Sequence, residues 1–159
     1  MIEIVTADEL PKVLDLAKWF YYRMNPHGGE FNEQSFLTAW TGLINNKQGF
    51  ILRRGNTEAI GMIIYPDPND GKLCAGFGFW YVANEDDSLA NGLLHKRMEE
   101  DLRKMGISRI FFSNLINDRQ QKVDKFLLHA GYRPVEVMYR RDLGRVKCEP
   151  DKEFIDMDE

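Results

Sequence analysis

The chain has 159 residues, 43% of them hydrophobic and 12% aromatic, which is enough apolar material for one domain with a full core. Its 21 basic and 25 acidic residues are spread along the sequence and give a formal charge of −4, which argues against a nucleic acid or an anionic membrane as the main partner. Cys74 and Cys148 lie too far apart for a recognisable metal or disulfide pattern, and the sequence shows neither a signal peptide nor an apolar stretch of membrane-spanning length, so it predicts a cytoplasmic protein.

The first third of the chain reads as one strand followed by two helices. Residues 2–5 predict a short strand, and the apolar spacing of residues 10–24 predicts a helix with one buried face. The breaker-rich segment 25–30 cannot continue that helix. Asn32 then offers the cap of a second helix that reaches Ile44.

Three strands separated by turn-rich segments follow, and they predict an antiparallel meander. The third of these strands has glycines in its interior. Strict alternation places Cys74, Gly76, Gly78, Trp80 and Val82 on one face, and Leu73, Ala75, Phe77, Phe79 and Tyr81 on the other. Interior glycines mark either a bulge or closely packed backbone, or the close approach of a ligand, and both interpretations stay open. The three strands are Gly49–Arg53, Ala59–Tyr65 and Leu73–Val82.

The second half alternates helix and strand signals after an acidic turn. The first of its helices should lie on the sheet through Leu89, Leu93, Leu94, Met98, Leu102 and Met105. The domain is expected to span 1–143, and 144–159 reads as an acidic tail, flexible or ordered by a partner. The predicted segments are the turn 85–87, a helix over 88–105, a strand over 107–114, a helix from 118 or 119 to 130, and a last apolar strand around 135–139.

Segment order and two local patterns give the chain a family resemblance. The run from Leu93 to Ile107 looks like a long helix with a glycine exit, and Phe126 to Tyr132 looks like a second helix with a Gly-aromatic step. In both respects the chain resembles the GCN5-related N-acetyltransferase (GNAT) superfamily over nearly all of Ile2 to Leu143. The resemblance implies a mixed α/β fold with a mostly antiparallel central sheet of six to seven strands, flanked by about four helices.

The resemblance also implies an acyl-CoA-dependent N-acyltransferase that uses acetyl-CoA and no metal, with direct attack by a small-molecule or protein amine. In the family, a turn of the pattern Arg/Gln-x-x-Gly-x-Gly/Ala holds the pyrophosphate of the cofactor. Here the turn falls on 85–90 or on 87–92, so an acid stands where the family has Arg or Gln. The adjacent carboxylates of Glu85, Asp86 and Asp87 would weaken the binding of the pyrophosphate.

Site residues follow from the same resemblance. Amides of Trp80, Tyr81 and Val82 would polarise the thioester, and Asp87, Ser88, Leu89, Ala90 and Asn91 would bind the pyrophosphate. Asn117 is the candidate for the pantetheine contact, with Asn114 and Gln120 as alternatives. The family's general-acid tyrosine corresponds to Leu127 here, so Tyr132 or Tyr139 would replace it. His27 and Glu30, in the loop that resembles the family's acceptor segment, are the candidate bases.

A second hypothesis from a different class also stays open. The acidic turn and the missing tyrosine are compatible with a catalytically inactive protein of this fold that serves as a binding or structural component. Its aromatic clusters, residues 19–22 and 79–81, would then contact a second copy or another protein. The ordinary alternative for both clusters is the core, and for His27 and Glu30 it is a solvated loop.

Overall fold

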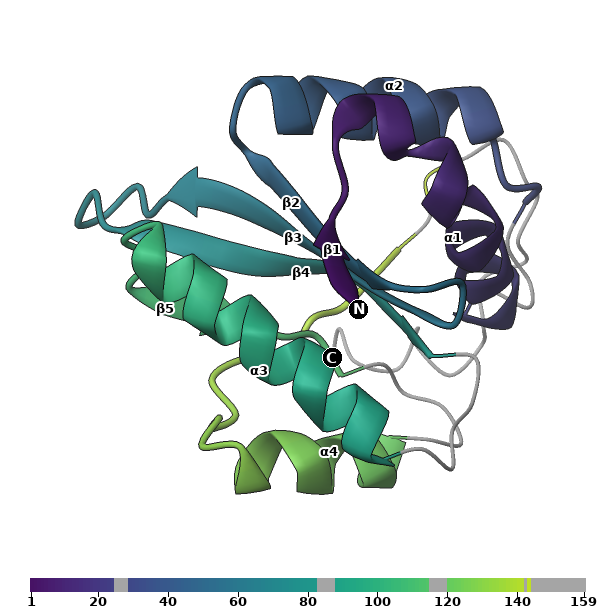
Figure 1. Cartoon of the computed structure of the whole chain (residues 1–159). Coiled ribbons are helices and arrows are strands. Elements are labelled where there is room, and N and C mark those ends of the chain that lie inside the picture. Colours follow the sequence, from purple (N-terminus) through teal and green to yellow (C-terminus); the bar gives the residue numbers. More distant parts are fainter. Residues whose placement is uncertain (25–28, 83–87, 115–119, 142, 144–159) are drawn as a thin grey trace, which may run out of the picture. The chain divides into compact units, whose positions relative to one another are not determined.

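The computed structural model describes residues 1–24, 29–82, 88–114, 120–141 and 143. They belong to two compact units, Met1–Asp124 and Lys125–Glu159. The first unit contains a five-stranded sheet in the order β1-β2-β3-β4-β5 (Figure 1). Its strands are β1 (Ile2–Ile4), β2 (Gly49–Arg54), β3 (Glu58–Pro66), β4 (Leu73–Val82) and β5 (Arg109–Phe111). The helices are α1 (Pro11–Met24), α2 (Glu33–Asn45), α3 (Ser88–Lys104) and α4 (Gln120–His129), preceded by a 3₁₀ turn at Ala7–Glu9.

The sheet is mixed and mostly antiparallel, as predicted. Strands β1 to β4 pair antiparallel in chain order, which confirms the meander, and β5 pairs parallel to β4. The expectation of six to seven strands is wrong for the described residues, which contain five. The predicted strand around 135–139 does not form there, and the side chains of Val135, Val137, Met138 and Tyr139 are 63–90% exposed. A strand is stable only when a neighbouring strand satisfies its backbone groups, and no strand among the described residues pairs with this segment.

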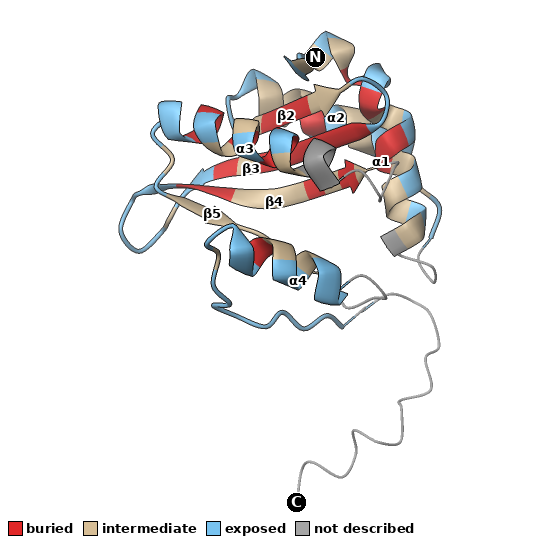
Figure 2. Cartoon of the chain, turned by 60° about the horizontal axis from the view of Figure 1, so that its bottom comes forward, coloured by how far each residue is buried: buried red, intermediate tan, exposed pale blue. Residues whose placement is uncertain are grey.

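Helices cover both faces of the sheet and produce two apolar clusters. Helices α1 and α2 lie on one face and α3 lies on the other (Figure 1). Figure 2 shows the buried residues concentrated on β2 to β4 and on the helix faces that cover them. The first cluster joins Val13 and Leu16 of α1 with Trp40 of α2 and the strand residues Ile51, Phe79 and Tyr81. The second joins Leu94, Met98 and Leu102 of α3 with the strand residues Leu52, Ile60, Met62 and Ala75.

Local signals account for the ends of several helices. The side chain of Asn32 accepts a hydrogen bond from the Ser35 amide at 2.8 Å, so the predicted cap of α2 is confirmed. Gly106 and Gly131 have φ values of 81° and 94° directly after α3 and α4, a region that glycine enters without strain. Both predicted glycine exits are therefore present.

The interior of β4 departs from strict alternation. Gly61 pairs with Phe79 while Met62 pairs with Phe77, so Gly78 is the extra residue of a β-bulge. The bulge reverses the faces beyond it: Phe77 packs against the α3 cluster, whereas Phe79 belongs to the cluster of α1 and α2. The prediction that these two rings share a face is therefore wrong, because period-two counting fails across an inserted residue.

The glycines at this bulge are packed by aromatic rings. A Cβ atom on Gly78 would lie 2.9 Å from the carbonyl oxygen of Gly61 and 2.9 Å from the ring of Trp40. A Cβ atom on Gly61 would lie 2.6 Å from the ring of Phe79. The bulge-and-packing interpretation of Gly78 is thus confirmed.

The buried face of α3 differs from the predicted one. Leu94, Met98 and Leu102 are fully buried as expected, but Leu93 and Met105 are 54% and 43% exposed. His95 is buried instead, with its ring 5.8 Å from that of Trp80 and 5.6 Å from that of Phe112. Its Nε2 lies 3.4 Å from a carboxylate oxygen of Glu99. Burial among aromatic rings lowers the pKa of His95 below its ordinary value of 6.5, and the charge of Glu99 opposes this only in part.

This burial predicts a pH-dependent stability. Below about pH 6.5 the unfolded chain protonates His95 while the folded chain resists it, so the free energy of unfolding should fall as the pH drops through that value. His95→Phe should make the free energy of unfolding fall less at acid pH than it does in the unaltered protein. His129→Phe, at an exposed position of α4, should leave that fall unchanged. Urea unfolding at pH 5.5 and 7.5 measures both variants against the unaltered protein. An unchanged pH slope in His95→Phe would contradict the prediction.

Candidate functional site

The outer edge of β4 is covered only in part. In the described residues, β5 pairs with β4 at Cys74, Ala75 and Gly76, and β4 then continues to Val82 beyond the last of these pairs. On its other side, β4 pairs with β3 along its whole length. The second half of β4 therefore presents an edge that no described strand covers.

The direction of the backbone groups along this edge follows from the register. Ile64 donates its N–H to the carbonyl oxygen of Gln48 at 2.8 Å, so even-numbered residues of β3 face β2 and odd-numbered residues face β4. Tyr81 pairs with Ala59, an odd-numbered residue of β3, so the amide of Tyr81 is directed toward β3. Trp80 and Val82 lie one residue to either side and direct their amides toward the outer edge of β4.

Helix α3 begins at Ser88, six residues after the end of β4. The first amides of any α-helix, through its third residue, have no acceptor within the helix, and here they include those of Ser88, Leu89 and Ala90. Asn91, the fourth predicted residue, lies in the same helical turn. The other predicted residues of this region, namely Glu85, Asp86, Asp87 and Asn117, lie outside the described residues.

The predicted acid-base residues are placed in different parts of the chain. Glu30 is exposed in the loop before α2, where the amide of the next residue, Phe31, donates to the hydroxyl of Tyr22 at 3.1 Å. His27, in the same loop, lies outside the described residues. Tyr132 belongs to the second unit and follows Gly131, and its amide donates to the carbonyl oxygen of Leu127 at 3.0 Å. Leu127, which corresponds to the family's tyrosine, is buried.

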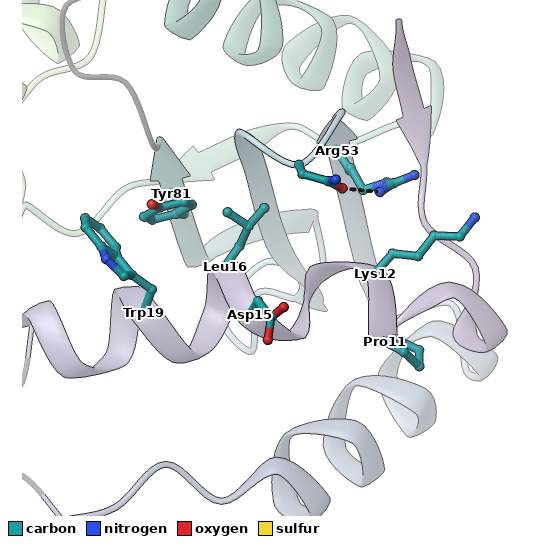
Figure 3. A pocket seen from close by; sticks show the side chains of 8 residues that line it. Pro11, Lys12, Asp15, Leu16, Trp19, Arg53 and Tyr81 are labelled. Carbon is teal, nitrogen blue, oxygen red and sulfur yellow. Dashed lines mark hydrogen bonds between the residues drawn. The ribbon is translucent and has the colours of Figure 1, made fainter.

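A pocket of about 490 Å³ lies between α1 and the ends of β2 and β4. Figure 3 shows Trp19 and Tyr81 at one end, Arg53 and Lys12 at the other, and Leu16 and Asp15 between them. The rings of Trp19 and Tyr81 meet edge to face with centroids 4.5 Å apart. Since Tyr81 belongs to β4, the pocket adjoins the strand whose outer edge is uncovered.

Two acidic residues near this end of the sheet, Glu58 and Asp15, were not among the candidates predicted from the sequence. Glu58 opens β3 opposite Val82 and is only 1% exposed, and Nη1 of Arg54 lies 3.9 Å from its carboxylate. In the sequence it follows a turn and looks like a solvated turn residue. Asp15 lies on the polar stripe of α1, and that position contains no local signal that a strand end faces it. Only the packing of distant segments identifies either residue.

The described residues contain neither a membrane-spanning helix nor a group of metal ligands. No helix there combines the length and the apolar character needed to cross a bilayer. Likewise, no three histidine, cysteine, aspartate or glutamate side chains in that part of the chain are grouped so that they could hold a metal ion.

Solved structures supply the similarities to known proteins. An aminoglycoside acetyltransferase from an uncultured soil metagenomic sample, in complex with sisomicin, matches with a TM-score of 0.70 and 12% identity, over 91% of this chain and 96% of its own. A ribosomal-protein-alanine N-acetyltransferase from Brucella melitensis biovar Abortus 2308 matches with a TM-score of 0.67 and 11% identity, over 91% and 99%. A predicted acetyltransferase from Clostridium acetobutylicum, with acetyl-CoA, matches with a TM-score of 0.72 and 10% identity, over 90% and 96%. No protein-family model matches the sequence, and neither does any curated protein.

Proposed function

We propose that this chain, which has the fold of the GCN5-related N-acetyltransferases, transfers an acetyl group from acetyl-CoA to an amine. The observation that carries the proposal is the uncovered outer edge of β4, which leads within six residues to the amino terminus of α3. A fold hosts many functions, so the proposal depends on this edge and not on the similarity alone.

The described residues fit such a cofactor. An extended pantetheine arm needs an uncovered strand edge to lie along, and a pyrophosphate is attracted by amides at a helix terminus. In the proposal, the outward amides of Trp80 and Val82 face the thioester, and the free amides of Ser88, Leu89 and Ala90, with Asn91 in the same turn, bind the pyrophosphate. Asn117 would contact the pantetheine arm.

In the proposed reaction the acetyl group passes directly from acetyl-CoA to the amine, and residues of this chain assist the transfer. Acetyl-CoA supplies an acetyl group activated as a thioester. The amide of Val82 stabilises negative charge that develops on the carbonyl oxygen while the amine nitrogen bonds to the carbonyl carbon and the carbon–sulfur bond breaks. His27 or Glu30 would take the proton whose loss converts the ammonium into the attacking amine. The nitrogen loses a second proton once the carbon–nitrogen bond has formed, and this balances the proton that the leaving thiolate takes up, for which the resemblance gives Tyr132 as the candidate donor. The acceptor is a small-molecule or protein amine.

The acidic turn before α3 favours a second candidate function. Carboxylates at Glu85, Asp86 and Asp87 repel a pyrophosphate, and each like-charge contact at a partly exposed site can cost about 1 kcal/mol, or about fivefold in affinity. If this repulsion exceeds the attraction of the amides, the chain is a non-catalytic protein of the same fold that acts through a partner or a second copy.

Isothermal titration with acetyl-CoA separates the two functions. We expect a dissociation constant in the micromolar range for the unaltered protein. The variant Glu85→Gln/Asp86→Asn/Asp87→Asn should bind about tenfold or more tightly, because three repulsive charges are removed. The gain should shrink between low and moderate salt, since ions screen exposed charges.

The control is a triple variant with the same change in net charge at exposed positions of the first unit, Asp8→Asn/Glu100→Gln/Asp124→Asn. It should leave the affinity for acetyl-CoA nearly unchanged. If neither the unaltered protein nor the neutralised turn binds millimolar acetyl-CoA, the transferase proposal is wrong and the non-catalytic function takes its place.

A further inference from the structure

The pocket between α1 and the strand ends contains an exposed carboxylate that forms no direct pair in the described part of the chain. Asp15 lines the pocket from the middle of α1, and neither a hydrogen bond nor an ion pair engages its side chain there. Lys12 and Lys18 are one helical turn away in either direction, and Arg53 lies across the pocket. Each of these cations could in principle neutralise Asp15.

Other carboxylates already hold all three cations. Lys12 Nζ lies 2.9 Å from Glu9, Lys18 Nζ lies 3.2 Å from Glu33, and Arg53 Nη2 lies 2.8 Å from Glu3. The other terminal nitrogen of Arg53 donates to Asn56 at 3.3 Å.

Two pKa shifts agree with these pairings. The amide of Thr6, assisted by Lys12, lowers the pKa of Glu9 to about 2, so Glu9 stays ionised. The hydrogen bond to Glu33 is the main cause that raises the pKa of Lys18, and the charge of Asp15 adds a smaller contribution. The three cations are thus paired directly with three other carboxylates, and Asp15 has only the longer-range attraction of Lys18.

We propose that this pocket binds an organic cation, a primary amine with a short apolar chain, through the carboxylate of Asp15. Where the proposed transferase function holds, this amine is the acceptor or an amine of the acceptor, a step that rests on that function. The cation binding itself does not depend on acetyl-CoA. The site lies beside the amino-terminal half of α1, separate in sequence from the loop of His27 and Glu30.

The rest of the lining suits such a ligand. A volume of about 490 Å³ lies within the range of small-molecule sites. Leu16, Trp19 and Tyr81 provide apolar surface for methylene groups next to Asp15 (Figure 3). The ring of Trp19 already stacks with a cation, because the guanidinium carbon of Arg23 lies 4.9 Å from its centroid. An anion would gain little, since the cations of the pocket are already paired.

Titration with n-butylamine hydrochloride, followed by NMR, tests the site without acetyl-CoA. The chain has three tryptophans, so its indole N–H region is simple, and Trp19→Phe assigns the relevant signal. We expect the Trp19 indole signal to shift and saturate with n-butylammonium at millimolar concentration. Ammonium chloride at the same ionic strength, 1-butanol and butyrate should not reproduce the saturating shift.

Two matched variants decide whether Asp15 carries the binding. Asp15→Asn should weaken n-butylammonium binding by about threefold to fivefold, the upper part of the range for an exposed charge pair. Asp8→Asn removes the same charge from an exposed position one turn before α1 and should leave the binding unchanged. Equal shifts with butyrate, no saturation with n-butylammonium, or an Asp15→Asn variant that binds as well as the unaltered protein would each overturn the proposal.

The outcome is independent of the transferase proposal. If amine binding depends on Asp15 while acetyl-CoA does not bind, the amine site is supported and the transferase function is contradicted. If acetyl-CoA binds and n-butylammonium does not, the transferase function is still supported, and its acceptor binds at a site other than the Asp15 pocket.

Discussion

Alanine at Gly78 is expected to lower the free energy of unfolding by about 2–3 kcal/mol. Its Cβ would lie 2.9 Å from a backbone oxygen of Gly61 and 2.9 Å from the ring of Trp40, which is itself buried between α2 and the sheet. Neither neighbour can yield cheaply, because one belongs to the hydrogen-bonded ladder and the other to the core. Such a loss is a large fraction of the roughly 5–15 kcal/mol that stabilises a domain. Urea unfolding monitored by circular dichroism measures it.

Gly76→Ala is the matched control for this prediction. It introduces the same methyl group into the same strand two residues earlier, but there the nearest atom is Cε1 of Tyr65, at 3.2 Å. Tyr65 is partly exposed, so its ring can move aside. We expect the control to cost about 1 kcal/mol or less. Equal losses for the two variants would mean that the packing at the bulge does not constrain Gly78.

Proline at Val82 is expected to reduce acetyl transfer by about two to three orders of magnitude while the protein stays folded. Proline removes the backbone N–H, and at Val82 that N–H faces the outer edge of β4, so no ladder bond to β3 is lost. In the proposed mechanism this amide stabilises charge on the reacting carbonyl. The initial rate of thiol release from acetyl-CoA, with an acceptor that the unaltered protein acetylates, measures the effect.

Val82→Ala is the control, because it changes the side chain and keeps the amide. It should retain a rate within a few-fold of the unaltered protein. The affinity for acetyl-CoA should change less than kcat in Val82→Pro, since the amide contributes mainly when charge develops. If Val82→Pro is folded and transfers acetyl groups at the unaltered rate, the amide of Val82 has no part in the reaction.

Residues of the candidate site could be named from the sequence only where their position along the chain was sufficient to identify them. The sequence places an acidic turn and the start of a helix after β4, so it could name Ser88 to Asn91 as candidates from their position alone, and their binding of a pyrophosphate stays a prediction. The sequence could not show that the N–H of Tyr81 points toward β3 while those of Trp80 and Val82 point outward. The direction of each N–H depends on which strand pairs with β4 and in which register. The sequence also gave no indication of Asp15, which becomes a candidate only because the structure places Arg53 and Tyr81 in the same pocket.

The order and type of most elements follow from local signals in the amino-acid sequence. The apolar spacing of α1, the cap at Asn32, the turns between β2, β3 and β4, and the glycines after α3 and α4 are local signals, and all of them act within a few residues. Tertiary structure decided the rest: the bulge at Gly78, the burial of His95, and the exposure of Val135 to Tyr139. Each of these depends on which distant segment lies opposite, and the free energy of that contact is not encoded in any single stretch of the chain.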